Sequence, residues 1–524
     1  MSEDTDFDAF APDLQRLEWV DIATVAQAVG GTCYGASGGE VRGAVIDNRR
    51  VRGGELFICM PGAHVHGAKF AADAVRRGAA AVLTDAVGYG MISGVEVRAI
   101  VVPDVASVAG KAADLAWGQP AKQLQVWGVT GTNGKTTTTY LLRHLLHRLG
   151  HRSALVGTVE VAVGKQSQAA NITTPQAPEV QAVAAVAVQN QVKNFVLEVS
   201  SHALGLGRVD PLHFGVAGFT NLSHDHLDFH HSMEEYFQTK ASLFSSQRCA
   251  VQVILVDDQW GQRLAGQLER AGQHNYVTLS TTGVQADWQA SITPLADGSS
   301  QLELRAFDGK SATVQVLMPG AFNAANAALA MVMVVSGCSP SPRQLDGAVL
   351  RRLAAHPIHV DVPGRMEVIS EGGTKQPRII VDFAHNPGAL RSLLEALRPS
   401  TPGRLLLVFG ATGQRDTEKR PILGEICAKF ADYFYLTDDD PHDEDPQAIR
   451  LAVRAGIPQG QDNFEEIDGR ETAIRRAIAA AQPGDTVVIA GRGHETVQET
   501  ASAAINLDDR AVAREALALR SRYF

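Results

Sequence analysis

Residues 124–150 read LQVWGVTGTNGKTTTTYLLRHLLHRLG. The apolar run at 124–130 predicts a buried strand, and the stretch 136–149, ended by Gly150, predicts a helix. Between them stands a glycine-rich turn, Gly-Thr-Asn-Gly-Lys-Thr, at residues 131–136. Such a turn presents backbone N–H groups at a helix N-terminus, which is where phosphates bind. The stretch therefore predicts a parallel α/β sheet that carries a phosphate-binding loop.

Two side chains of this loop have the chemistry that nucleotide binding needs. Lys135 is expected to reach the terminal phosphates, and Thr136 is expected to hold Mg²⁺. Val129 occupies the place of the first glycine in the commoner G-x-x-x-x-G-K-[ST] motif, so this loop is a shorter variant. The alternative is a structural turn with an exposed lysine. The predicted ATP contacts are Gly131, Thr132, Asn133, Gly134, Lys135, Thr136 and Thr137.

The remaining chain predicts three successive α/β domains, at residues 1–121, 122–348 and 349–524. The first alternates short apolar runs with glycine-rich turns and helical stretches. The second continues with strands at 194–199 and 216–222 and an antiparallel ribbon within 286–318, and the third alternates strands and helices like a nucleotide-binding fold. The architecture expected is a central parallel-sheet ATPase domain flanked by a small N-terminal α/β domain and a Rossmann-like C-terminal one.

Bulk composition limits the function classes. The chain has 524 residues, 45% hydrophobic and 20% charged, and a formal net charge of -10, which predict a folded protein without general affinity for nucleic acid. The acidic start does not resemble a secretory signal, and the apolar run 324–336 is short for a membrane span. We expect a cytoplasmic monomer whose five scattered cysteines are reduced core thiols, at Cys33, Cys59, Cys249, Cys338 and Cys427.

Seven further blocks, together with the loop, resemble the Mur ligase family over nearly the whole chain. They are TTP at 173–175, EVSSH at 198–202 continuing to Arg208, TNLSHDHLD at 220–228, GAFN at 320–323, GRME at 364–367, DFAHNP at 382–387 and GRGHE at 491–495. The resemblance implies an ATP- and Mg²⁺-dependent ligase of peptidoglycan synthesis. Its most similar members add the third amino acid to UDP-N-acetylmuramoyl-L-alanyl-D-glutamate.

The resemblance also assigns a magnesium site. Glu198 ends a predicted strand beside the phosphate loop and is expected to bind Mg²⁺ with Thr136, although a strand-end carboxylate can also serve as a helix cap. His226 lies in a histidine- and aspartate-rich run that could suggest zinc, but the family makes it a magnesium ligand. Lys240 would ordinarily be a surface lysine, and the family implies that it is carbamylated and metal-binding. The catalytic residues expected are Lys135, Glu198, His226 and Lys240.

Further substrate contacts are implied by the same resemblance. The UDP-linked dipeptide is expected at Asn48, Thr173, Thr174, Ser201 and Arg208, whose hydroxyl, amide and guanidinium groups suit a pyrophosphate- and carboxylate-bearing ligand. Each residue could equally be a cap or a surface residue. Around ATP, the family places Asn323 and Asn326 near the adenine and adds Arg365, Asp382 and His385, of which His385 could equally be a structural histidine.

The incoming amino acid is expected to meet Arg415, Asp440, Pro441, His442, Gly491 and Glu495. Relatives that add diaminopimelate carry D-N-P-R where this chain reads Asp-Asp-Pro-His at 439–442, and histidine does not reproduce the bidentate fork of arginine. Residues 438–445 hold six acidic side chains, which would favour a distal ammonium. We therefore expect L-lysine to be added, with ornithine or diaminopimelate as the alternatives.

The expected reaction joins an amino group to an activated carboxylate. The D-glutamyl carboxylate attacks the γ-phosphate of ATP, and the amino acid then displaces phosphate from the acyl phosphate. One alternative is a folylpolyglutamate synthetase, against which the long N-terminal block argues. Another is an ATP-binding regulatory protein that does not ligate.

Overall fold

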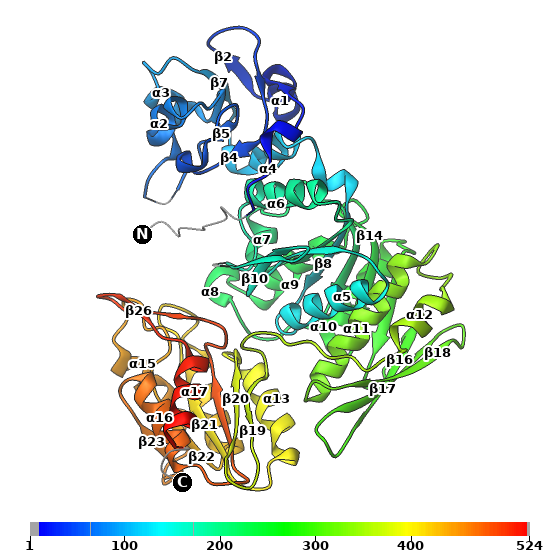
Figure 1. Ribbon diagram of the computed structural model, residues 1–524, viewed down its shortest axis with the longest axis vertical. Coiled ribbons are helices and arrows are strands. Elements are labelled where there is room, and N and C mark those ends of the chain that lie inside the picture. Colours follow the sequence, from blue (N-terminus) through cyan, green and yellow to red (C-terminus); the bar gives the residue numbers. More distant parts are fainter. Residues whose placement is uncertain (1–9, 63, 171, 521–524) are drawn as a thin grey trace.

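The computed structural model describes residues 10–62, 64–170 and 172–520, and its three large sheets follow one another along the chain (Figure 1). Helices pack on each of them, so the predicted α/β class and three-part architecture are confirmed. Short 3-10 helices connect several elements, namely η2 (Leu14–Arg16), η3 (Asn48–Arg50), η4 (Gly67–Phe70), η5 (Pro120–Gln123), η6 (Ser242–Phe244) and η7 (Arg398–Ser400).

The N-terminal part holds a five-stranded sheet in the order β2-β7-β6-β5-β4, parallel except for the edge strand β2. Asp21, Asp85 and Asp104 cap the starts of three helices with their carboxylates. The elements are β1 (Val20–Asp21), α1 (Ile22–Val29), β2 (Thr32–Tyr34), β3 (Glu40–Val41), β4 (Ala44–Val45), β5 (Leu56–Ile58), α2 (Ala71–Arg76), β6 (Ala81–Thr84), α3 (Ala86–Met91), β7 (Arg98–Val101) and α4 (Val105–Ala116).

The central part is an eleven-stranded sheet in the order β11-β10-β9-β12-β8-β13-β14-β15-β16-β17-β18. Strands β9, β12, β8 and β13 to β16 are parallel, and antiparallel strands extend both edges. The ribbon predicted within 286–318 is confirmed as β16 to β18. The strands are β8 (Gln125–Thr130), β9 (Ser153–Val156), β10 (Glu160–Val163), β11 (Gln166–Ala169), β12 (Asn194–Glu198), β13 (Phe214–Phe219), β14 (Cys249–Leu255), β15 (Tyr276–Ser280), β16 (Trp288–Pro294), β17 (Ser300–Ala306) and β18 (Ser311–Val316).

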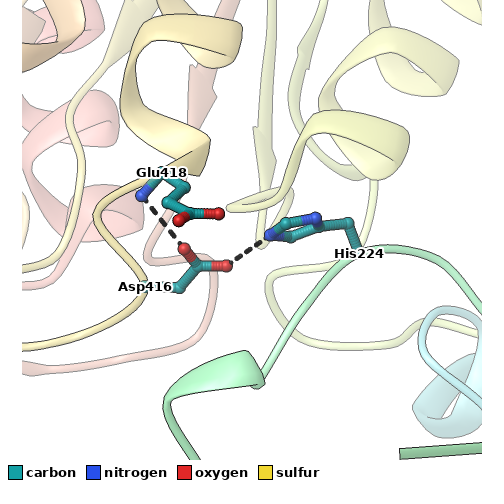
Figure 2. Close-up of side chains that lie close together, drawn as sticks. All are labelled: His224, Asp416 and Glu418. Atoms are coloured by element: carbon teal, nitrogen blue, oxygen red, sulfur yellow. Dashed lines mark hydrogen bonds and ion pairs between the residues drawn. The ribbon is translucent and has the colours of Figure 1, made fainter. Parts of the chain in front are cut away.

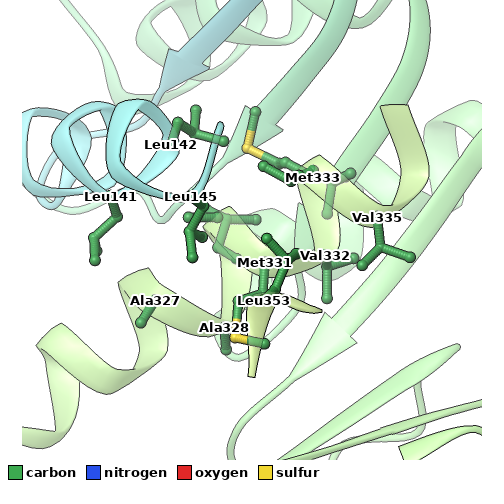
Figure 3. Packing of buried hydrophobic residues seen from close by; sticks show 14 of the residues in the cluster. Leu141, Leu142, Leu145, Ala327, Ala328, Met331, Val332, Met333, Val335 and Leu353 are labelled. Carbon is green, nitrogen blue, oxygen red and sulfur yellow. The ribbon is translucent and has the colours of Figure 1, made fainter. Parts of the chain in front are cut away.

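Eight helices described in this part cover its sheet and carry the loops at the strand ends. The phosphate-loop helix, α5, packs against α11 through leucine and methionine side chains, as Figure 3 shows. The helices are α5 (Lys135–Arg148), α6 (Ala177–Gln189), α7 (Ser201–Gly205), α8 (Leu227–His230), α9 (Met233–Ala241), α10 (Gln259–Arg270), α11 (Ala321–Cys338) and α12 (Gly347–Leu353).

Helix α11 contains the apolar run seen in the sequence, and its length and composition would suffice for a membrane span. However, 67% of its 18 residues are buried inside the protein. Met331 and Met333 pack in the same cluster as Leu141 and Leu145 of α5. This burial between helix and sheet is that of a core helix.

The C-terminal part holds a six-stranded sheet in the order β19-β20-β24-β21-β22-β23, parallel except for the edge strand β19. A separate hairpin, β25–β26, follows the last parallel strand. The elements are β19 (Glu367–Glu371), β20 (Arg378–Asp382), α13 (Pro387–Leu397), β21 (Leu405–Phe409), α14 (Lys419–Phe430), β22 (Tyr433–Leu436), α15 (Pro446–Arg454), β23 (Phe464–Glu466), α16 (Arg470–Ala480), β24 (Thr486–Ala490), β25 (Val497–Glu499), β26 (Ala504–Asn506) and α17 (Asp509–Arg520).

The structure bears on one predicted domain boundary and on the predicted state of the cysteines. The predicted boundary at 348 and 349 falls inside α12, which packs against α11 and α5, so we propose that the chain leaves the central domain after Leu353. All five cysteines are free, but Cys33 is exposed and Cys338 is half-buried, so only three are core thiols. The first boundary, at 121 and 122, remains a prediction.

Candidate active site

The phosphate loop is supported by the strand beside it. Gly131 has φ 147° and Gly134 has φ 86°, conformations that favour glycine. Asn221, after β13, receives the Thr132 N–H on its carbonyl (2.8 Å) and the Asn133 N–H on its side-chain oxygen (3.0 Å). The loop that follows β13 therefore fixes the shape of the loop that follows β8. Asn221 belongs to the block at 220–228, but nothing in that block indicates this role.

Thr136 and Glu198, the predicted magnesium ligands, are in direct contact. The Thr136 hydroxyl donates to Glu198 Oε2 at 2.9 Å, and Glu198 is fully buried at the end of β12. Thr158 donates to the same carboxylate with its hydroxyl and its backbone N–H, each at 2.9 Å. Hard oxygen atoms thus gather next to the phosphate loop, as Mg²⁺ requires. Thr158 was missed because nothing in its local sequence marks it.

Lys135 and Lys240 converge on one backbone carbonyl. Their Nζ atoms donate to the Gly131 oxygen at 3.1 Å and 2.7 Å, and Lys240 is 1% exposed. Burial lowers the pKa of both amines, and the neighbouring charge of Lys135 lowers the pKa of Lys240 further. Lys240 is therefore a buried amine and not the surface lysine that its helical position alone would suggest.

His226 lies between these lysines and a group of aromatic rings. It precedes α8 in a left-handed conformation, with φ 55°. Its ring is 5.2 Å from the His202 ring and 6.1 Å from the Tyr236 ring, measured between centroids. Partial burial, followed by the charges of Lys135 and Lys240, lowers the pKa of His226 and favours the neutral imidazole that binds metals.

Four of the five predicted dipeptide contacts lie close to one another and to Glu198. Thr174 donates to the Glu198 carbonyl at 2.8 Å, and Arg208 donates to the Thr174 carbonyl at 3.1 Å. Thr173 Oγ1 lies 3.1 Å from Thr158 Oγ1, and Ser201 is buried with no hydrogen-bond partner for its hydroxyl in the described part of the chain. The fifth residue, Asn48, lies apart from them in the N-terminal sheet region, where its amide donates to Asp73 at 2.7 Å.

Residues of the C-terminal part reach the phosphate loop from the other side. Arg365 donates to the Thr136 hydroxyl at 3.3 Å and stacks over Phe383, with its guanidinium carbon 4.0 Å from the ring centroid. Asp382 accepts the N–H groups of Met366 (2.7 Å) and Ala384 (2.8 Å), so its carboxylate shapes this turn. Burial raises the pKa of Asp382, while the nearby Arg365 opposes that rise.

Two other predicted nucleotide contacts already have partners within the protein. His385 donates from Nδ1 to the Phe383 carbonyl at 2.8 Å, and its Nε2 lies 3.7 Å from Asp225. Asn323 donates to the Pro319 carbonyl at 2.7 Å. The assignment of these residues to ATP remains a prediction.

Asn386, to which the sequence assigned no role, also connects the two domains. Its amide donates to Asn133 of the phosphate loop at 2.9 Å and to Asp225 at 3.2 Å, and the side chain is 1% exposed. Lys419 also reaches Asp225, at 3.7 Å. Asn386 belongs to the DFAHNP block at 382–387, but its partner Asn133 lies 253 residues away along the chain.

A second contact between the domains lies at the same junction. His224 Nε2 is 2.7 Å from Asp416 Oδ2, and Glu418 lies beside them (Figure 2). The Glu418 N–H donates to the other oxygen of Asp416 at 3.0 Å. The hydrogen bond between His224 and Asp416 therefore joins the loop after β13 to the start of α14.

The structure gathers most of the predicted amino-acid contacts at the ends of β22 and β24. Carboxylate oxygens of Asp439, Asp440 and Glu495 lie within 4.8 Å of one another, and Asp440 is paired with the fully buried Arg492. Burial, followed by the charges of Asp439 and Asp440, raises the pKa of Glu495 to about 8. A Cβ atom at Gly491 would lie 2.5 Å from Asp439, so this glycine gives the carboxylate room.

Asp439 was missed as a site residue. It is 3% exposed, and its Oδ2 has no hydrogen-bond partner among the residues that the structure describes. Arg415 is exposed and belongs to the loop before α14, where its charge contributes to lowering the pKa of His202 in the central domain. No recorded contact within the described ranges joins Arg415 to the three carboxylates.

Several carboxylates of the acidic run at 438–445 have partners within the protein, whereas the sequence suggested free negative charge. Asp438 pairs with Arg450, and Glu444 pairs with Arg420 at 2.6 Å. Asp445 caps the first turn of α15. Structural partners therefore offset much of this charge, which weakens the sequence argument for a distal ammonium.

Comparison with known proteins identifies the architecture. Residues 40–117 match the family described as Mur ligase family, catalytic domain, residues 129–334 match the Mur ligase middle domain, and residues 364–493 match the Mur ligase, glutamate ligase domain. The chain belongs to the Mur ligase family. The family and fold expected from the sequence are thus confirmed.

Similar Mur ligases match most of the chain. The UDP-N-acetylmuramoyl-L-alanyl-D-glutamate--2,6-diaminopimelate ligase of Corynebacterium glutamicum is 42% identical over 88% of this chain and 89% of its own. A solved structure with the same enzyme name is 30% identical, with a TM-score of 0.61 over 92% of this chain and 96% of that one. The MurF ligase of Thermotoga maritima, solved in complex with ADP, is 21% identical with a TM-score of 0.60 over 92% and 97%, which shows the shared fold alone.

Proposed function

We propose that this Mur ligase uses ATP to add a diamino acid, diaminopimelate, to UDP-N-acetylmuramoyl-L-alanyl-D-glutamate. The observation that carries the proposal is the junction at which Arg365 and Asn386 of the C-terminal part contact Thr136 and Asn133 of the phosphate loop. At such a junction, a nucleotide bound in the loop is also within reach of the domain that holds the carboxylate cluster. The ADP complex of the Thermotoga maritima neighbour supports ATP as the nucleotide.

The choice of diaminopimelate rests on the relatives. Both proteins above that are at least 30% identical bear the name of a diaminopimelate ligase. They support the alternative that the sequence analysis kept open and not its preference for lysine. The partners found for Asp438 and Glu444 remove part of the reason for that preference.

L-Lysine or ornithine is a second candidate, which the carboxylate cluster also suits. Asp439, Asp440 and Glu495 face one another with Arg492 as the nearby cation, and Asp439 Oδ2 lacks a partner in the described chain. A buried carboxylate in this state suits an ammonium group. Diaminopimelate also carries two ammonium groups, so the cluster alone does not choose between these substrates.

Magnesium fits the residues present. Thr136 and Glu198 offer hard oxygen atoms at the loop, and we propose that they hold Mg²⁺ together with His226. Bound Mg²⁺ supplies positive charge that offsets the charge developing on the transferring phosphoryl group. Lys240 fits the carbamylation implied by the family, because its buried amine is held towards the neutral form that reacts with CO₂.

The proposed mechanism assigns the remaining work to side chains of this protein. Lys135, at the base of the loop, neutralises the phosphates of ATP as the D-glutamyl carboxylate attacks the γ-phosphate. Thr173, Thr174, Ser201 and Arg208 orient the UDP-linked dipeptide. Burial raises the pKa of Glu495 to about 8, which makes its carboxylate a stronger base. The ionised form, whose fraction grows as the pH approaches 8, can accept a proton from the incoming ammonium. The free amine then displaces phosphate from the acyl phosphate.

The test is formation of the tripeptide product, measured with ADP release, for diaminopimelate, L-lysine and L-ornithine in turn. Product with diaminopimelate alone supports the main proposal, and product with lysine or ornithine alone selects the second candidate. ADP release without product for any of them would favour the ATP-binding regulatory protein. Lys135→Ala should lower turnover by roughly 10²- to 10³-fold, while Glu425→Ala, on the exposed face of α14, should not.

A further inference from the structure

The hairpin β25–β26 lies against the loop that carries the predicted amino-acid contacts. It runs along the top edge of the C-terminal part in Figure 1. Gln498 donates to the Asp439 carbonyl at 2.5 Å, and the Glu499 N–H donates to Asp440 Oδ1 at 3.1 Å. Arg492 contacts the same oxygen of Asp440. The hairpin therefore helps to orient a carboxylate of the acidic cluster.

Glu499 makes two contacts with His442. Its carbonyl accepts the His442 N–H at 3.0 Å, and its carboxylate Oε2 is 3.0 Å from His442 Nδ1. His442 has φ 51°, a left-handed conformation that costs free energy for a residue with a side chain. The contacts with Glu499 hold the backbone and the ring in this conformation.

The carboxylate also decides which ring nitrogen is left for a ligand. An ionised carboxylate only accepts hydrogen bonds, so Nδ1 must carry the hydrogen in this contact. Nε2 is then the nitrogen available to a substrate, as an acceptor for an ammonium or, when protonated, as a donor to a carboxylate. The His442 side chain is 19% exposed, whereas the Glu499 side chain is 63% exposed, so Glu499 lies on the outer side of the pair.

We propose that Glu499 is a positioning residue that acts through His442 to set the part of the pocket that receives the far end of the added amino acid. The proposal rests on the function proposed above. It assigns selectivity between diaminopimelate and lysine or ornithine to a hairpin residue 57 positions away from the loop. Glu499 itself is not expected to touch the substrate.

The test compares Glu499→Ala, His442→Ala and the double variant with the full-length enzyme. Loss of a charge-assisted hydrogen bond should raise KM for the preferred amino acid about tenfold in each single variant. KM for ATP and for the UDP-linked dipeptide should stay within about twofold, since neither ligand depends on this contact. The preference for one amino acid, measured as the ratio of kcat/KM values among the three, should therefore decrease in these variants.

The double variant shows whether Glu499 acts through His442. If it does, the double variant should be no worse than His442→Ala alone, and Glu499→Asp should restore part of the selectivity. Additive losses, or an unchanged amino-acid KM in Glu499→Ala, would overturn the inference. Glu425→Ala serves as the matched control, and circular dichroism verifies folding.

The unmodified enzyme is assayed first, so that the two proposals fail separately. If it forms no tripeptide with any diamino acid, the proposed function is wrong and the inference falls with it. If it forms tripeptide and the variants behave like the unmodified enzyme, only the role of Glu499 is wrong.

Discussion

Gly131 shows how one residue without a side chain permits the phosphate loop. A Cβ atom at this position would lie 1.9 Å from the Thr220 hydroxyl and 2.9 Å from the Asn221 carbonyl. The residue also has a positive φ, which a side chain disfavours. Both restrictions arise from the neighbouring strand β13 and its loop, which press against the turn.

Gly131→Ala should therefore destabilise the protein, by roughly 1–3 kcal/mol, and weaken nucleotide binding. Chemical unfolding and calorimetric titration with a non-hydrolysable ATP analogue would measure the two effects. Gly90→Ala is the control, because a Cβ atom at that helical position meets nothing within 4 Å. Equal stability of the two variants would contradict this account of the loop.

Glu495 links the amino-acid site to the pH dependence of stability. Its pKa is raised from 4.5 to about 8, so in the folded protein it keeps its proton up to about pH 8, while in the unfolded chain it ionises near pH 4.5. Between these values the folded state binds more protons, and the free energy of unfolding falls as pH rises. Above about pH 8 the contribution of Glu495 to the free energy of unfolding no longer changes with pH.

Glu495→Gln removes this titration. The variant should gain stability relative to the unmodified protein as pH increases from 4.5 towards 8, with no further gain above. Urea unfolding at several pH values measures the difference, with Glu425→Gln on exposed α14 as the control. Parallel stability curves for Glu495→Gln and the unmodified protein would show that Glu495 does not titrate in this way.

At the scale of elements, helix α5 connects the phosphate loop to the linker that leads into the C-terminal part. Lys135 lies at its first turn. Near its end, Arg148 donates to the carbonyls of Leu353 (2.6 Å), His356 (2.7 Å) and Pro357 (2.8 Å). The first turn of α5 therefore contributes to the proposed nucleotide site, and its last residue holds the linker.

Arg148→Ala should loosen this linker. Loss of the three hydrogen bonds should cost about 1–2 kcal/mol locally, seen as faster hydrogen exchange at residues 354–362 and a higher KM for ATP. Arg152→Ala, an exposed arginine just beyond the helix, is the matched control. Unchanged exchange in Arg148→Ala would contradict the role of this side chain in holding the linker.

At the scale of the whole molecule, the proposed active site is divided between two domains. His224 and Asp416 form one cross-domain contact, and Asn386 with Asp225 forms another close by. These contacts place the C-terminal part over the phosphate loop. Domain closure should therefore contribute directly to nucleotide affinity.

A double-mutant cycle on His224→Ala and Asp416→Ala tests this contribution. The nucleotide dissociation constant should reveal a coupling of roughly 0.5–3 kcal/mol between the two positions. The surface pair Arg263 and Glu234, which lies within the central part, is the control and should show no coupling to nucleotide binding. Zero coupling for His224 and Asp416 would mean that their contact does not stabilise the closed arrangement.

The elements, and the chemistry that each carries locally, could be predicted from the amino-acid sequence. The strand expected at 194–199 is found at Asn194–Glu198, and the phosphate loop lies between β8 and α5 as expected. Apolar periodicity, glycine turns and helix caps act over a few residues, so they can be read directly along the chain. Glu198 was found for the same reason, since it ends a strand.

The contacts between polar groups that are distant along the chain became known from the folded arrangement. Asn386 meets Asn133 across 253 residues, and Glu499 meets His442 across 57. The acidic run at 438–445 looked like free charge until folding supplied Arg450 and Arg420 as partners. Such pairings depend on how domains and hairpins pack, and no local pattern encodes a partner that is distant along the chain.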